Sequence, residues 1–215
     1  MNKYFKYEEE LVKTFKSFIN DDRNIIIQEM PIRWGNIDLI SIKNAKIPFS
    51  SEQCKLLSKP SAAKIFLKIK KNRPISKKTL SLEIGLSENT INLLIRELIK
   101  QNLIKKVNDL YYRNIDFEFP KVTVTGYEAK LHDYNKTLFQ ASINKNYVDY
   151  SYMVFPMDIA NKIFYKNKHI LKNEGIGIIG VTEQGYKIIL KANIKNELKN
   201  YIRLINLVQS SLLST

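Results

Sequence analysis

Residues 122–130 read Val-Thr-Val-Thr-Gly-Tyr-Glu-Ala-Lys, and residues 35–42 read Gly-Asn-Ile-Asp-Leu-Ile-Ser-Ile. Both stretches are rich in β-branched and apolar residues, which is typical of strands. Asp38 lies inside the earlier stretch, and Glu128 and Lys130 lie at the end of the later one. Residues two apart on a strand point to the same face, so Glu128 and Lys130 project together while the alanine between them turns into the core.

The surrounding segments predict an α/β domain with a mixed central sheet flanked by helices. The amphipathic stretch 6–20 predicts a first helix that carries Glu8, and residues 25–29 predict a strand. Further on, we expect helices at 133–144, 157–165 and 196–213 and strands at 150–155, 176–182 and 186–191. If the strands 35–42 and 122–130 pair as a hairpin, Asp38 joins Glu128 and Lys130.

The middle of the chain predicts a separate, mostly helical domain of the winged helix-turn-helix type. Helices are expected at 62–71, 76–84 and 87–101, with Ser76 and Ser87 as N-caps of the last two. A hairpin of 103–107 and 110–113 around Asn108-Asp109 follows as the wing. Residues 44–60 lack periodicity and are interpreted as a linker.

This pattern divides the chain into three parts, because insertions are tolerated in surface loops. Residues 1–44 form the first part of the α/β core, residues 45–118 the inserted winged-helix domain, and residues 119–215 the second part of the core with the C-terminal helix.

The acidic residues and the lysine form a set suited to phosphodiester hydrolysis. Asp38 and Glu128, with Glu8 of the first helix as a candidate third carboxylate, supply the oxygen ligands that Mg²⁺ prefers. A metal polarises the scissile phosphate and helps to generate hydroxide, and Lys130 stabilises the developing charge or positions the attacking water.

The sequence resembles the PD-(D/E)XK nuclease superfamily over residues 5–43 and 121–192. Residues 35–40 (GNIDLI) are similar to its aspartate strand, and residues 127–130 (YEAK) to its E-x-K strand. The resemblance implies a restriction-endonuclease-like core in which Asp38 and Glu128 ligate Mg²⁺ (with Mn²⁺ as a substitute), Lys130 assists and Glu8 lies near the metal. The chain departs from the pattern at Ile37, where the family name has proline, and at Asn144, where many relatives have tyrosine four residues after a helix glutamine.

Charge and motif together predict binding to double-stranded DNA. The chain carries 35 basic and 21 acidic residues, a net charge of +14, which favours contacts with phosphates. In a winged helix the third helix enters the major groove with its N-terminal residues. The candidate contacts are Lys77, Lys78, Asn89, Thr90, Asn92, Arg96, Lys105, Lys106 and Arg113.

We therefore expect a Mg²⁺-dependent DNA endonuclease of restriction-modification, defence or mobile-element type. The alternatives are a non-catalytic DNA-binding regulator with an inactive core, and a nuclease subunit whose winged helix docks a partner protein. Double-strand cleavage would suggest a homodimer formed through the helix 196–213, although that helix could equally pack on its own core. One cysteine excludes a disulfide framework. Without an apolar run of about 18 residues or a signal peptide, no membrane contact and a cytoplasmic, intracellular location are expected.

Overall fold

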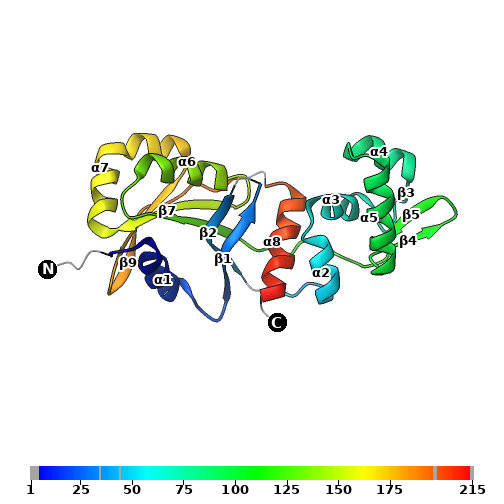
Figure 1. The fold of residues 1–215 in the computed structure, drawn as a ribbon, viewed down its shortest axis with the longest axis horizontal. Helices are drawn as coiled ribbons and strands as arrows, with labels where there is room; N and C mark the ends of the chain where they lie inside the picture. The colour runs from blue at the N-terminus through cyan, green and yellow to red at the C-terminus, as the bar shows by residue number, and fades with distance from the viewer. Residues whose placement is uncertain (1–4, 34, 44, 196–197, 214–215) are drawn as a thin grey trace. The chain divides into compact units, whose positions relative to one another are not determined.

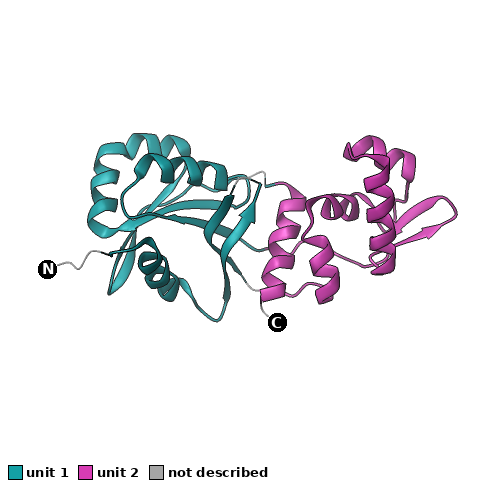
Figure 2. Cartoon of the chain, in the orientation of Figure 1, with its two compact units in different colours: residues 1–44, 122–198 teal, residues 45–121, 199–215 magenta. Residues whose placement is uncertain are grey.

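Two compact units make up the computed structural model, which describes residues 5–33, 35–43, 45–195 and 198–213 (Figure 2). Unit 1 comprises residues 1–44 and 122–198, and unit 2 comprises residues 45–121 and 199–215. Each unit is therefore built from two separate pieces of the chain.

Unit 1 is built on a six-stranded sheet with the order β1-β2-β6-β7-β8-β9. Its strands are β1 (Asn24–Ile32), β2 (Gly35–Lys43), β6 (Val124–Ala129), β7 (Tyr150–Pro156), β8 (Gly177–Thr182) and β9 (Gly185–Leu190). The pairs β6–β7 and β7–β8 are parallel, and the other three pairs are antiparallel. The predicted α/β class with a mixed central sheet is confirmed, and so is the pairing of the two strands that carry Asp38 and Glu128.

Helices cover both faces of this sheet (Figure 1). Helix α1 (Glu8–Ile19) packs on one face, and α6 (Tyr134–Asn144) and α7 (Met157–Glu174) pack on the other. Side-chain alternation along the strands fills both cores. Within β7, Val154 joins Leu11 and Phe15 of α1, whereas Met153 packs beside Ile163 of α7.

Unit 2 consists of helices and a small three-stranded sheet with the order β3-β5-β4. Its helices are α2 (Ser51–Leu57), α3 (Pro60–Lys68), α4 (Lys77–Ile84), α5 (Glu88–Lys100) and α8 (Asn200–Leu213). Its strands are β3 (Ile75–Ser76), β4 (Ile104–Val107) and β5 (Leu110–Arg113).

The predicted local signals of α4, α5 and the hairpin are present. Ser76 and Ser87 accept hydrogen bonds from the backbone N–H groups of Thr79 and Thr90, which caps the two helices. Gly85 ends α4 with a φ of 69°, a left-handed conformation that glycine adopts without strain. The antiparallel pair β4–β5 forms the predicted hairpin.

Two expectations about unit 2 are wrong. The supposed linker 44–60 contains α2, whose N-terminus is closed by a capping box between Ser50 and Gln53. The C-terminal helix, expected in the α/β core, belongs to unit 2, where α8 packs on α2 and α3.

Burial of α8 also removes the basis for the predicted dimer interface. Ile202, Ile205, Leu207 and Val208 are buried within the chain, and among the large apolar residues described on this helix Leu213 is the exposed one. The alternative, a helix that packs on its own chain, explains this apolar face. In the described part of the chain, no helix has the length and apolarity to cross a bilayer.

Candidate functional site

The antiparallel pairing of β2 with β6 brings the two strand carboxylates together. Leu39 is in register with Tyr127, so the preceding residue Asp38 lies beside Glu128. The backbone N–H of Ala129 donates a hydrogen bond of 2.8 Å to Oδ2 of Asp38. The aspartate is thereby fixed at the end of β6 although it is 91 residues away in the sequence.

Lys130 lies directly after β6 and contacts three carboxylates. Its Nζ is 3.6 Å from Oδ2 of Asp38, 3.6 Å from Oε1 of Glu128 and 3.3 Å from Oε2 of Glu8. The four residues selected from the sequence as catalytic are thus neighbours, and they come from α1, β2, β6 and the residue after β6. We call Glu8, Asp38, Glu128 and Lys130 the acidic-lysine cluster.

Burial perturbs the carboxylic acids of the cluster. Glu128 has a fully buried side chain, and desolvation together with the neighbouring charge of Asp38 raises its pKa to about 7, although Lys130 and Asn144 act in the opposite direction. Burial also raises the pKa of Asp38, against the lowering effect of the Ala129 hydrogen bond. Such shifts are common at functional sites, and they also occur in structural ion pairs.

The lysine remains a cation in this environment. Burial acts to lower the pKa of Lys130, but the charges of Asp38, Glu128 and Glu8 outweigh it, so that the net pKa is raised. The cluster therefore holds a positive charge next to Glu128, whose carboxyl group has a pKa of about 7.

The two carboxylate oxygens of Glu128 differ in their partners, because one accepts a hydrogen bond and the other is only in an ion pair with Lys130. Nδ2 of Asn144, in α6, donates a hydrogen bond of 3.1 Å to Oε2. Oε1 is buried and has no hydrogen-bond partner among the described residues, with the Lys130 ammonium group 3.6 Å away. Buried acceptors are normally satisfied, so an unpartnered oxygen in an acidic cluster fits a position for a cation.

The donor set also sets a limit on the kind of metal. In the ranges that the structure describes, no group of three or more His, Cys, Asp or Glu side chains is arranged as a metal site. Mg²⁺ commonly uses one or two carboxylates and completes its shell with water, so Asp38 and Glu128 fit its requirements. Glu8 is half exposed, pairs with Lys130 and lies in the first turn of α1.

Asn144 was missed as a site residue. In the sequence it marks only a departure from the tyrosine expected at that place, whereas in the structure its buried side chain orients Glu128. Its position on the helix that returns after β6 was the available signal, but helix spacing does not specify which strand residue it reaches.

The predicted DNA contacts of unit 2 are mostly on its surface. Lys78, Asn89, Thr90, Arg96, Lys105 and Lys106 are exposed, and Lys77 and Asn92 are half buried. Two of the lysines are already paired with acids of the same unit. Lys77 lies 2.8 Å from Oε1 of Glu88, and Lys106 lies 3.2 Å from Oδ1 of Asp109.

Arg113 is a correction to the predicted DNA contacts. Its side chain is buried, its Nε donates to the Ile69 carbonyl at 3.0 Å, and its Nη1 donates to the Phe117 carbonyl at 3.1 Å. The guanidinium also lies 4.9 Å from the centre of the Phe66 ring. Arg113 therefore holds unit 2 together and is not accessible to a phosphate.

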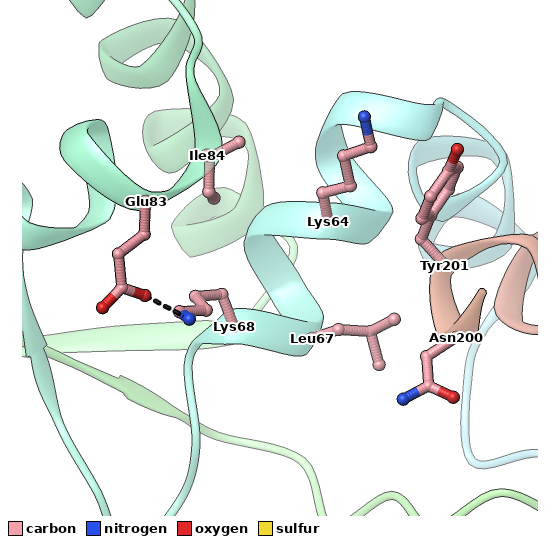
Figure 3. Close-up of a pocket in the computed structure, with 7 residues that line it drawn as sticks. All are labelled: Lys64, Leu67, Lys68, Glu83, Ile84, Asn200 and Tyr201. Carbon is pink, nitrogen blue, oxygen red and sulfur yellow. Dashed lines mark ion pairs between the residues drawn. The ribbon is translucent and has the colours of Figure 1, made fainter.

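A pocket of about 420 Å³ in unit 2 lies between α3, α4 and α8 (Figure 3). Lys68 forms an ion pair with Glu83 across it, and Nζ of Lys64 lies 4.7 Å from the centre of the Tyr201 ring. The remaining lining residues are Leu67, Ile84 and Asn200. Lys68 and Lys64 both interact with residues of unit 2, so we interpret this pocket as a junction between helices.

No family model matches the chain, and no curated protein or solved structure matches it. Function is accordingly inferred from the acidic-lysine cluster and from the arrangement of unit 2.

Proposed function

We propose that this protein is a Mg²⁺-dependent DNA endonuclease with a restriction-endonuclease-like core in unit 1 and a winged helix in unit 2. One observation carries the proposal: a carboxylate oxygen of Asp38 and one of Glu128 each lie 3.6 Å from Nζ of Lys130. Asp38 and the strand end at Ala129 are 91 residues apart in the sequence. Carboxylates and a lysine on adjacent strands are what metal-assisted phosphodiester hydrolysis requires.

In this proposal each residue of the cluster has one role. Asp38 and Glu128 would hold Mg²⁺, and the bound metal would polarise the phosphate and lower the pKa of a water molecule. Lys130 keeps its proton and stabilises the charge that develops on the phosphate. Glu8 holds the Lys130 ammonium group from the solvent side. In hydrolysis the attacking water gives up a proton as its oxygen bonds to phosphorus, the bond to the leaving oxygen breaks, and that oxygen takes up a proton.

Unit 2 supports duplex DNA as the substrate. Two capped helices joined through Gly85 precede a hairpin that pairs with a third short strand, which is the order of a winged helix. The exposed N-terminal residues Asn89 and Thr90 of α5 are of types that contact base edges and phosphates. Restriction, defence and mobile-element nucleases all fit this combination.

A second candidate is a nuclease subunit whose unit 2 docks a partner protein. Leu82 of α4 and Leu93 of α5 favour it, because their side chains are 77% and 57% exposed on the two helices expected to face DNA. A non-catalytic regulator is disfavoured, since Asp38, Glu128 and Lys130 are all present and lie close together.

Cleavage of supercoiled plasmid tests the proposal. Wild type with Mg²⁺ should nick or linearise the plasmid, EDTA should abolish cleavage, and Asp38→Asn and Lys130→Met should each lower the rate at least about 100-fold, because each removes a charge on which the transition state depends. Duplex binding in EDTA should survive both substitutions.

The matched control is Glu9→Gln, an exposed acid next to Glu8, which should cut like wild type. Mutants as active as wild type would refute the assigned site. Binding without cleavage, on methylated and unmethylated plasmid alike, would favour the partner-dependent subunit or the regulator.

A further inference from the structure

The exposed face of α7 concentrates positive charge on unit 1. Between residues 159 and 173 the sequence has four lysines and no acid. Ala160, Ile163 and Leu171 are buried in the core, and Ile159 and Phe164 pack against it, so the polar positions between them lie on the opposite face. The outward positions include Lys162, Tyr165, Lys166, His169 and Lys172, spaced three or four residues apart along most of the helix.

Most of these ammonium groups have no acidic partner among the described residues. Lys162, Lys166 and Lys172 form no ion pair within the part of the chain that the structure describes, and Lys168 lies over the Phe164 ring at 5.4 Å. Unit 2 differs, because six of its lysines pair with acids. Those are Lys55, Lys59, Lys68, Lys71, Lys77 and Lys106.

Like charges four residues apart destabilise a helix, so the pairs 162/166 and 168/172 oppose folding of α7 when no anion is present. An anionic partner would remove that repulsion. Tyr165, which is 83% exposed between these lysines, adds a hydroxyl group of the kind that contacts phosphate oxygens.

We infer that the outer face of α7 binds the phosphate backbone of nucleic acid, as a contact of unit 1 in addition to any contact made by unit 2. Residues 162 to 172 extend about 15 Å along the helix axis. Over that length, duplex DNA carries about nine phosphate charges. The inference rests on the proposed function only for the identity of the polyanion, and it does not depend on metal or on cleavage.

Salt-dependent binding of a labelled 30-base-pair duplex to the full chain in EDTA tests the inference. Removing one lysine that neutralises a phosphate should lower the slope of log K against log salt by about 0.9. The variant K162Q/K166Q/K172Q should therefore lower the slope by nearly three and weaken binding at least about tenfold at 100 mM salt.

The matched control is K13Q/K187Q/K191Q, which removes three exposed lysines of unit 1 outside α7 and should change affinity less than about threefold. Equal weakening in both variants, or no duplex binding by wild type at 50 mM salt, would overturn the inference. So would an α7 variant that binds duplex normally but no longer binds vesicles containing phosphatidylserine.

The outcome is separable from that of the nuclease proposal. If wild type binds duplex through α7 but never cuts it, the nuclease proposal is refuted and the α7 contact is supported. If wild type cuts and the α7 variant keeps the affinity and salt slope of wild type, the nuclease proposal is supported and the α7 contact is refuted.

Discussion

At the scale of single residues, the acidic-lysine cluster combines one cation with three acids in a partly desolvated setting. Glu128 is the most affected, since its burial and the nearby Asp38 raise its pKa to about 7. A carboxylic acid that titrates near neutral pH links folding stability to pH.

Glu128 should make the protein less stable as pH rises. Its pKa in the folded protein, about 7, lies above its ordinary value of 4.5, so the folded state binds this proton more tightly than the unfolded chain does. Stability therefore falls between these pH values. Glutamine does not titrate, so the free energy of unfolding of Glu128→Gln, measured relative to wild type, should rise by about 2 kcal/mol from pH 5 to pH 8.

Urea unfolding of both proteins in EDTA at the two pH values measures this difference. Glu9→Gln, at an exposed position, should run parallel to wild type. If the stability of Glu128→Gln also changed with pH as that of wild type does, the Glu128 carboxylic acid would have the same pKa in the folded and unfolded protein.

The face on which a residue lies could be predicted from the sequence wherever strand alternation applies. Alternation placed Glu128 and Lys130 on one face and Ala129 in the core, because the period of two is a property of the backbone. Arg113 shares its face with buried Tyr111 by the same rule, and that alternation, not its charge, was the informative signal. Asn144 could not be assigned, because its contact with Glu128 depends on how α6 packs.

At the scale of elements, caps and turns were predicted well and lengths less so. Ser76 and Ser87 begin their helices where expected, since a hydroxyl that accepts from the helix N-terminus acts locally. Helix α7 extends to Glu174, well beyond the expected end at residue 165, because apolar positions such as Leu171 continue its buried face. Helix α2 spans too few residues for a periodic pattern.

The packing of β7 against β8 depends on a glycine. A Cβ added at Gly177 would overlap the Tyr152 ring and lie 2.8 Å from the backbone nitrogen of Ala192. Gly177→Ala should therefore lower the free energy of unfolding by about 1–3 kcal/mol, as overpacked cores do.

Gly185→Ala is the matched control, because a Cβ there meets no atom of the described chain within 4 Å. Thermal unfolding should separate the two variants by several degrees. Equal melting temperatures would show that the structure around Gly177 accommodates a methyl group without loss of stability.

At the scale of the whole molecule, each unit is closed by a segment from a distant part of the chain. Residues 122–198 complete unit 1, and residues 199–215 complete unit 2. The insertion pattern was visible in the sequence as a helical block between strand-rich segments. The return of α8 to unit 2 was not, because an amphipathic helix does not specify its partner.

Ending the chain after residue 198 should destabilise unit 2 selectively. The truncation exposes the parts of α2 and α3 that pack on α8, while the strands of unit 1 keep their neighbours. Hydrogen exchange should show reduced protection in α2 and α3 and unchanged protection in β6, β7 and β8. A uniform reduction across both units would mean that they unfold as one.

The interleaved connectivity has a consequence for folding during synthesis. When residues 1–121 have left the ribosome, only β1 and β2 of the main sheet have been made, and β2, which carries Asp38, lacks its neighbour β6. Unit 2 in turn lacks α8 until that helix emerges. The nascent chain therefore carries the aspartate of the proposed metal site before its glutamate and lysine have been made. The proposed nuclease becomes competent to cut only after β6 is in place.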